Sequence, residues 1–205
     1  AQSTVHAQAT VQAYQNLYMR VTQGTPVLND ALSGQTGSLW DMNSGTSGSC
    51  AFSGGTYHAS TPSIGFFQAC YAESTNFSNF AFQVYMTITQ GDDGGIIFRA
   101  DNVNDKFYLF RVDGKGNYEL YLYNSNQGSQ AKSLMGGTTT LMKPVGQANE
   151  ITLVAQGGTL VFYLNKHYLN SEIDATYSAG MVGVFAESTA HTTDVAFSNA
   201  QVWTL

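Results

Sequence analysis

The sequence predicts an all-β protein, a sandwich or a barrel, preceded by a short α-helix. From Pro26 onward, hydrophobic and polar residues alternate in short segments that recur about every ten residues. Gly, Asn, Asp and Ser separate these segments, and no stretch after residue 25 has helical spacing over more than a turn. A chain of 205 residues suits one domain that buries a sizeable core.

The first 23 residues differ from the rest, because they contain no Gly or Pro and are rich in Ala, Gln and Thr. Their apolar residues share one narrow helical face, formed by Val11, Tyr14, Tyr18 and Val21. Gly24 and Pro26 end this pattern. We expect residues 1–25 to be a helical segment that packs on the domain or serves as a stalk, and residues 26–205 to be the β-domain.

The charge balance argues against a nucleic-acid partner. Eight Lys and Arg residues are scattered singly among 14 Asp and Glu, so the net charge is -6 and no basic stripe is present. No apolar stretch reaches the roughly 18 residues that would span a bilayer. The chain starts at Ala1 without a Met, which is compatible with an upstream signal or membrane anchor. Only 11% of the residues are charged, a bias common in secreted and cell-surface β-proteins, so we expect an extracellular or cell-surface location.

The two cysteines, Cys50 and Cys70, allow two interpretations. A polar composition and an even count favour a disulfide, which would stabilise the fold by about 3 kcal/mol. Two buried free thiols are the alternative. Neither cysteine has a CxxC neighbour or a nearby histidine, so the pattern does not indicate zinc.

Strand periodicity divides the side chains between two faces. The segment 79–90, "NFAFQVYMTITQ", places alternate apolar residues in a core, namely Phe80, Phe82, Val84, Met86 and Ile88. Further strands are predicted at residues 95–100, 106–113, 118–124, 150–156, 159–166, 180–187 and 195–205.

The polar side of these strands is the predicted ligand-binding face. A buried unpaired arginine is costly, so Arg99 and Arg111 should lie on the open side, with Glu119 beside them. The same alternation adds tyrosines and an amide, and the predicted set is Gln83, Tyr85, Arg99, Arg111, Glu119, Tyr121 and Tyr123. Aromatic rings beside hydrogen-bonding groups suit a sugar. The alternative is a structural ion-pair ladder in which tyrosines cover the charged stems.

Three segments carry a resemblance to a known superfamily. They are "GGIIFRADNVNDKFYLFRVDGKGNYELYLY", "TLVFYLNKHYL", in which Lys166 replaces a usual Gly, and "SAGMVGVFAESTAHTTDVAFSNAQVWTL". With the earlier segments "PVLNDALSGQTGSLW" and "CAFSGGTYHAS", the chain from about residue 26 onward resembles the concanavalin A-like lectin and glucanase superfamily. The likeness is to its laminin-G-like and 3-keto-disaccharide hydrolase-like bacterial branches.

This resemblance implies a jelly-roll β-sandwich of two antiparallel sheets that binds ligands on a concave sheet face or its rim. It also implies an extracytoplasmic module of a bacterial surface protein. The fold hosts lectins, adhesion modules, hydrolases and inert spacers, so it leaves the activity open.

Catalytic motifs are weak in this sequence. The glucanase pattern Glu-x-Asp-x-x-Glu has one near match, "EIDATY" at residues 172–177, which lacks the third acid. No Gly-x-Ser-x-Gly elbow occurs, and the four histidines are isolated. We therefore expect no catalytic residues.

Calcium is the one cofactor that the sequence leaves open. Asp92 and Asp93, or Asp101 and Asp105, offer oxygen ligands without the spacing of a calcium loop. Asp, Asn and Gly also form turns, and we interpret "GDDGG" at residues 91–95 as a turn.

The main hypothesis is an extracytoplasmic module that binds a glycan or a cell-surface polysaccharide. A glycoside hydrolase-like enzyme of the same fold is the first alternative. A non-catalytic structural or protein-binding domain is the second.

Overall fold

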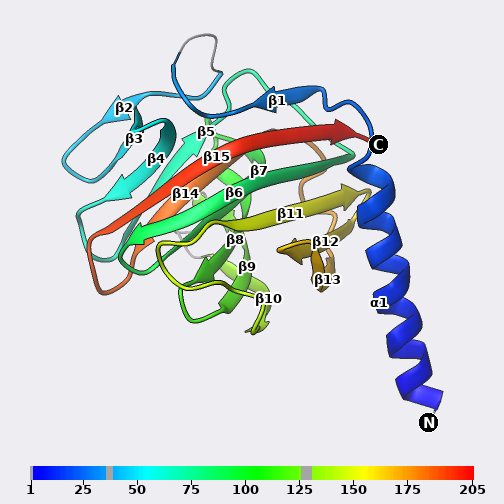
Figure 1. Ribbon diagram of the computed structural model, residues 1–205. Helices are drawn as coiled ribbons and strands as arrows, with labels where there is room; N and C mark the ends of the chain where they lie inside the picture. The colour runs from blue at the N-terminus through cyan, green and yellow to red at the C-terminus, as the bar shows by residue number, and fades with distance from the viewer. Residues whose placement is uncertain (1, 36–38, 126–130) are drawn as a thin grey trace.

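The structure is a β-sandwich with one flanking helix. The computed structural model describes residues 2–35, 39–125 and 131–205, with side chains from residue 8 onward. In this part of the chain, fifteen strands form two antiparallel sheets and one helix precedes them (Figure 1). The all-β prediction with an N-terminal helix is confirmed.

The larger sheet has nine strands and contains both ends of the β-domain. Its order is β13-β12-β11-β6-β15-β4-β3-β2, and β1 pairs with the end of β15. The strands are β1 (Leu28–Asp30), β2 (Asn43–Ser44), β3 (Ser49–Ser53), β4 (Thr56–Thr61), β6 (Phe80–Gln90), β11 (Asn149–Gln156), β12 (Thr159–Leu164), β13 (His167–Ile173) and β15 (Thr193–Thr204).

The smaller sheet has six strands in the order β10-β9-β8-β7-β14-β5. They are β5 (Phe66–Tyr71), β7 (Asp93–Asp101), β8 (Lys106–Asp113), β9 (Asn117–Asn124), β10 (Lys132–Thr138) and β14 (Met181–Ser188). The eight strands expected from periodicity are present as β6–β9, β11, β12, β14 and β15. Periodicity missed the others, several of which are short or lie at sheet edges.

The interpretation of "GDDGG" as a turn is wrong for its second half. β7 begins at Asp93, so Asp93 and the two glycines after it lie within the sheet. Gly95 is required there, because a Cβ atom at this position would lie 2.0 Å from the carbonyl oxygen of Phe110 on the neighbouring strand.

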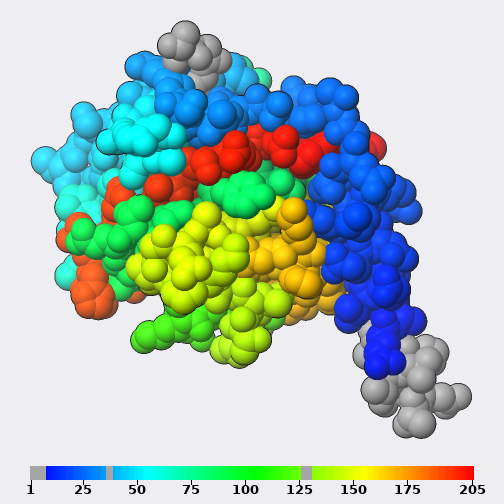
Figure 2. All heavy atoms as spheres, viewed as in Figure 1, coloured from blue at the N-terminus to red at the C-terminus, as the bar shows by residue number. Residues whose placement is uncertain are grey.

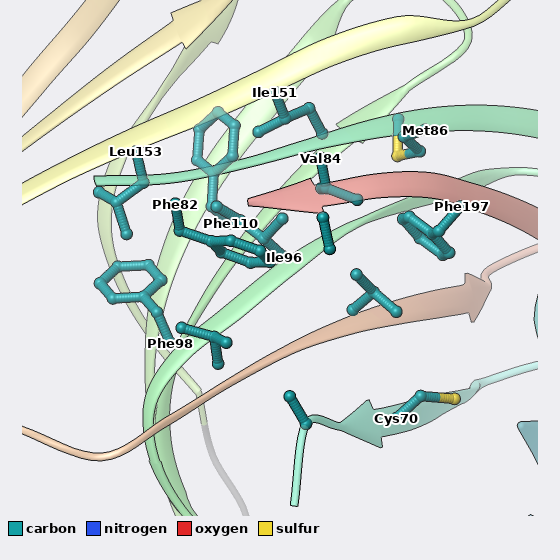
Figure 3. Close-up of a cluster of buried hydrophobic side chains, with 14 of the residues drawn as sticks. Cys70, Phe82, Val84, Met86, Ile96, Phe98, Phe110, Ile151, Leu153 and Phe197 are labelled. Atoms are coloured by element: carbon teal, nitrogen blue, oxygen red, sulfur yellow. The ribbon is translucent and has the colours of Figure 1, made fainter. Parts of the chain in front are cut away.

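Aromatic and aliphatic side chains from both sheets form the main core. Phe82 and Val84 of β6 and Ile151 of β11 face Ile96 and Phe98 of β7 across the sandwich (Figure 3). The rings of Phe110 and Phe162, one from each sheet, stack with centroids 4.3 Å apart. This packing supplies the apolar burial on which the fold rests.

A disulfide joins Cys50 of β3 to Cys70 of β5 and so links the two sheets. Both cysteines are fully buried in the core. The prediction of a disulfide is confirmed, and the alternative of free thiols is wrong.

Helix α1 (Gln2–Val21) packs with its second half on the outer face of the larger sheet. The ring of Tyr14 stacks on that of Tyr168 at 5.0 Å, and Tyr18 is buried against Tyr163. Figure 2 shows the helix in contact with the β12–β13 region, and in Figure 1 its N-terminal end extends past the edge of the sheet. Within the described residues, no helix has the length and apolarity needed to cross a bilayer.

Candidate functional site

The outer face of the smaller sheet carries four of the predicted site residues. Arg111 of β8 lies directly opposite Glu119 of β9. Tyr121 and Tyr123 follow Glu119 at every second position of β9, so they project from the same face. Helix α1 packs on the other sheet and not on this face.

Arg111 is the centre of a group of charges that we call the Arg111 cluster, formed by Arg111, Asp93, Glu119 and Glu187. The guanidinium group is 3.2 Å from the Glu187 carboxylate, 3.4 Å from that of Glu119 and 3.8 Å from that of Asp93. It also lies 5.4 Å from the ring centroid of Tyr121, within the range of a cation–π interaction. Three acids from three different strands therefore share one arginine.

Asp93 is the buried member of this cluster, with 4% of its surface exposed. It lies directly across from Glu187 on β14. Burial and the Glu187 carboxylate raise the pKa of Asp93 to about 8, although Arg111 opposes the rise. Among the described residues, its Oδ1 atom has no hydrogen-bond donor. The direction of this shift favours the protonated form of Asp93 near neutral pH.

An aromatic patch adjoins the Arg111 cluster on the same face, formed by Phe67, Phe107, Tyr121 and Tyr123. The rings of Phe107 and Tyr123 stack at 4.6 Å, and Phe67 meets Tyr123 edge-on at 5.9 Å. A depression of about 350 Å³ lies between this patch and Arg111. A second pocket of about 260 Å³ lies on the other side of Arg111, against Asp93 and Glu119.

Arg99 does not lie on this face, so that part of the prediction is wrong. The backbone of Arg99 is left-handed (φ 48°), and the pairing of β7 with both neighbours shifts register at this point. This bulge turns the side chain inward, where only 1% of it is exposed. Its guanidinium group donates to three carbonyl oxygens, those of Ser78 (2.8 Å), Gly157 (2.8 Å) and Tyr177 (3.0 Å).

Gln83 and Tyr85 do project away from the core, but they belong to the other sheet. Tyr85 and Tyr18 of helix α1 donate to the two oxygens of the buried Glu150 carboxylate, at 2.9 and 2.7 Å. The Tyr18 hydroxyl also reaches the side-chain oxygen of Gln83 at 3.4 Å. The prediction that Gln83 and Tyr85 share a face with Arg111 is wrong, because they lie beside the helix on the outer face of the larger sheet.

Two of the calcium candidates use their carboxylates in turns. Asp92 accepts the backbone N–H groups of Thr189, Ala190 and His191 at 2.6–2.8 Å. Burial alone would raise the pKa of Asp92. The hydrogen bonds to its carboxylate outweigh this effect and hold the pKa well below its usual range. Asp101 accepts the N–H groups of residues 103 and 104 in the hairpin turn that also contains Asp105.

In the described part of the chain, one group has the spacing of metal ligands: Asp41, Cys50 and Cys70. The two sulfur atoms of this group are already bonded to each other. Calcium binding at Asp92, Asp93, Asp101 or Asp105 stays a prediction.

Sequence reasoning missed the roles of Asp93 and Glu187 in the Arg111 cluster. Their signal was present in the alternation of residues 93–97 and 183–187, which places both carboxyl groups on the outward side. The strand order, which makes β7 and β14 neighbours, was needed to bring them together.

The architecture identifies the class: this is a concanavalin A-like jelly roll of two antiparallel sheets. No protein-family model and no curated protein sequence matches the chain. Among solved structures, it is similar to carbohydrate-binding module CBM66 from Bacillus subtilis, with 19% identity and a TM-score of 0.66 over 82% of this chain and 96% of that one.

Two other similar structures belong to different kinds of protein. The exoplasmic/lumenal domain of VIP36, in its Ca²⁺/Man3GlcNAc-bound form, is 12% identical with a TM-score of 0.61 over 87% of each chain. The β-glucanase of Bacillus licheniformis is 8% identical with a TM-score of 0.60 over 90% of this chain and 100% of that one. At identities this low, the TM-scores show a shared fold and nothing more.

The position of Arg99 predicts a large effect on stability. We expect Arg99→Met to lower the free energy of unfolding by about 3 kcal/mol or more, because three carbonyl oxygens lose a charged donor. Arg20→Met, at an exposed site on helix α1, is the matched control and should change it by less than about 0.5 kcal/mol. Urea unfolding measures both, and equal effects would contradict the buried role of Arg99.

The raised pKa of Asp93 predicts a stability that falls as pH rises. Between the ordinary aspartate pKa of about 4 and the folded value of about 8, the native state holds a proton that the unfolded state has lost. Raising the pH through this window should lower the free energy of unfolding by up to about 1.4 kcal/mol per unit. Asp93→Asn should remove this component, whereas Glu73→Gln, at an exposed carboxylate, should retain it. Urea unfolding at pH 5 and pH 8 compares the three proteins, and parallel pH dependence in all of them would refute the assignment.

Proposed function

We propose that the chain is an extracytoplasmic module that binds a glycan on the outer face of the smaller sheet. The observation that carries this proposal is the depression between the aromatic patch and the Arg111 cluster. There, Tyr121 and Tyr123 adjoin the guanidinium group of Arg111 and the half-exposed carboxylate of Glu187. The Glu119 carboxylate binds Arg111 from the side of the second pocket. Ring faces offer stacking surfaces for the C–H groups of a sugar, and the charged groups offer hydrogen bonds to its hydroxyls.

The chemistry of the tyrosines supports this role. Burial raises the pKa of Tyr121 to about 12, so its hydroxyl remains a hydrogen-bond donor at neutral pH. An apolar surface with a few polar groups around it is the usual composition of a small-ligand site. The likeness to the carbohydrate-binding module CBM66 supports the same class of ligand.

The disulfide supports the proposed location. Disulfides form and persist in oxidising compartments and are rare in the cytosol. Cys50 and Cys70 are bonded within the core, where the link joins the two sheets. The bonded pair therefore supports a location outside the cytoplasm.

Arg111 provides the test of glycan binding. In affinity electrophoresis against a panel of polysaccharides, we expect the wild-type chain to be retarded by at least one of them. Arg111→Met should weaken that binding about tenfold or more, because a charged hydrogen-bond donor is lost. Arg20→Met removes the same charge at a distant exposed site and should bind as the wild type does. If no polysaccharide of the panel binds, with or without calcium, the proposal is wrong.

A second candidate function is glycoside hydrolysis, which the pairing of Asp93 with Glu187 favours. A glycosidase needs two carboxyl groups, one of which keeps its proton near neutral pH. Asp93 meets the second requirement, and Glu187 lies directly across from it.

Chromogenic glycosides distinguish the two functions. If the pair is catalytic, turnover should occur and should be lost in both Asp93→Asn and Glu187→Gln, while Glu73→Gln retains it. Binding without turnover in the wild-type protein would reject the enzymatic function and leave the binding function intact.

A further inference from the structure

The pocket of about 260 Å³ beside Arg111 has an excess of negative charge. Among the described residues, its acids are Asp113, Glu119 and the protonated Asp93, and its one base is Arg111. Arg111 is itself shared, since Glu119 and Glu187 bind its two terminal nitrogens. The acids around this pocket therefore outnumber the positive charge available to them.

Asp93 supplies a second, independent observation. It is 96% buried, given its exposed fraction of 4%, and it lines the pocket. Its Oδ1 atom lacks a hydrogen-bond donor in the described structure. A buried carboxyl oxygen without a donor is costly unless it takes up a proton or meets a donor from a ligand.

We propose that this pocket holds the protonated amine of an amino sugar, with the ammonium group donating to Asp93 and Glu119. The proposal rests on the proposed glycan-binding function and specifies its ligand as a glycan with free amino groups. An ammonium group brings one positive charge and three donors, which match the excess of carboxylates. The adjoining aromatic patch provides the surface for the sugar ring that carries the amine.

The spacing of the carboxylate oxygens favours an amine over a divalent cation. In the described residues, the acids of the Arg111 cluster are not among the groups whose ligand atoms converge within 4.8 Å of one another. Calcium needs six to eight converging oxygens, and here Arg111 occupies the space between the carboxylates. An ammonium group needs two or three acceptors and tolerates a wider spacing.

Binding of the amine should release a proton. Without ligand, Asp93 keeps a proton because it is buried beside Glu187. The charged groups that face it from neighbouring segments are Arg111 and Asp113 on β8, Glu119 on β9 and Glu187 on β14, with Asp92, Lys115 and His191 around the adjoining pocket. An arriving ammonium group stabilises the Asp93 carboxylate and so displaces the proton.

The test compares a glucosamine oligosaccharide with its fully N-acetylated counterpart of equal length. Isothermal titration calorimetry at pH 6.5 should give tighter binding of the free amine by about tenfold or more. Repeating the titration in buffers of different ionisation enthalpy should reveal proton release with the amine and none with the acetylated sugar. Raising the salt concentration should weaken binding of the amine alone.

Substitutions of the acids test whether the amine binds in this pocket. Asp93→Asn should abolish both the preference for the amine and the proton release. Glu73→Gln makes the same change of charge at an exposed site and should behave as the wild type. Melting temperatures confirm that each variant is folded, and Glu119→Gln repeats the test with a half-exposed acid.

The outcomes separate this inference from the proposed function. Equal binding of both sugars, or a preference that persists in Asp93→Asn, overturns the amine site and keeps glycan binding. Binding of neither sugar nor any panel glycan overturns both. Stabilisation by calcium chloride that Asp93→Asn removes assigns the pocket to a metal and also overturns the amine site, as does binding of free lysine as tight as that of the amino sugar.

Discussion

The guanidinium group of Arg99 joins three loops that close one end of the sandwich. Its carbonyl partners precede β6, connect β11 to β12 and connect β13 to β14, so a residue of the smaller sheet binds segments of the larger one. Burying an arginine is costly unless most of its donors are paired, and each of these three bonds therefore constrains the position of its loop. Among the described residues, the buried Nε of Arg99 has no partner. The hydroxyl of Tyr108, on the neighbouring strand, adds to this end by accepting from the N–H group of Tyr177.

The bulge that turns Arg99 inward also affects the charge on the outer face of the smaller sheet. On β7, Asp93, Gly95 and Ile97 point outward, and regular alternation would place Arg99 with them. The left-handed conformation of Arg99 breaks this alternation and moves the cation to the inside. As a result, β7 contributes an acid to the outer face and a base to the interior.

Sequence periodicity predicted the sides of the strands but could not assign strands to sheets. For β7, β8 and β9, the inward and outward residues are those expected, with Arg99 as the exception. β6 and β7 follow one another in the chain, yet they lie in different sheets. Tyr85 therefore projects correctly away from the core, but onto the sheet that carries helix α1 rather than beside Arg111.

Long-range pairing accounts for the parts of the site that sequence reasoning did not reach. Glu187 meets Asp93 only because β14, near the end of the chain, pairs with β7. Glu150 meets Tyr18, 132 residues away in the sequence, only because the helix packs on the larger sheet. Local sequence patterns do not predict which distant strands pair. The bulge at Arg99 also has no recognisable signal in "GIIFRADN".

Because this protein has few basic residues, burying one of them affects the balance of charge on its surface. The chain has eight Lys and Arg residues, and one of them, Arg99, is buried inside the protein. Arg111 is left to balance three carboxyl groups on the outer face, and the retained proton of Asp93 removes one of those negative charges. A proton in this position is a replaceable counter-charge, because any cation that reaches the pocket competes with it. An excess of acids that would only destabilise an isolated fold thus becomes a means of selecting a positively charged ligand.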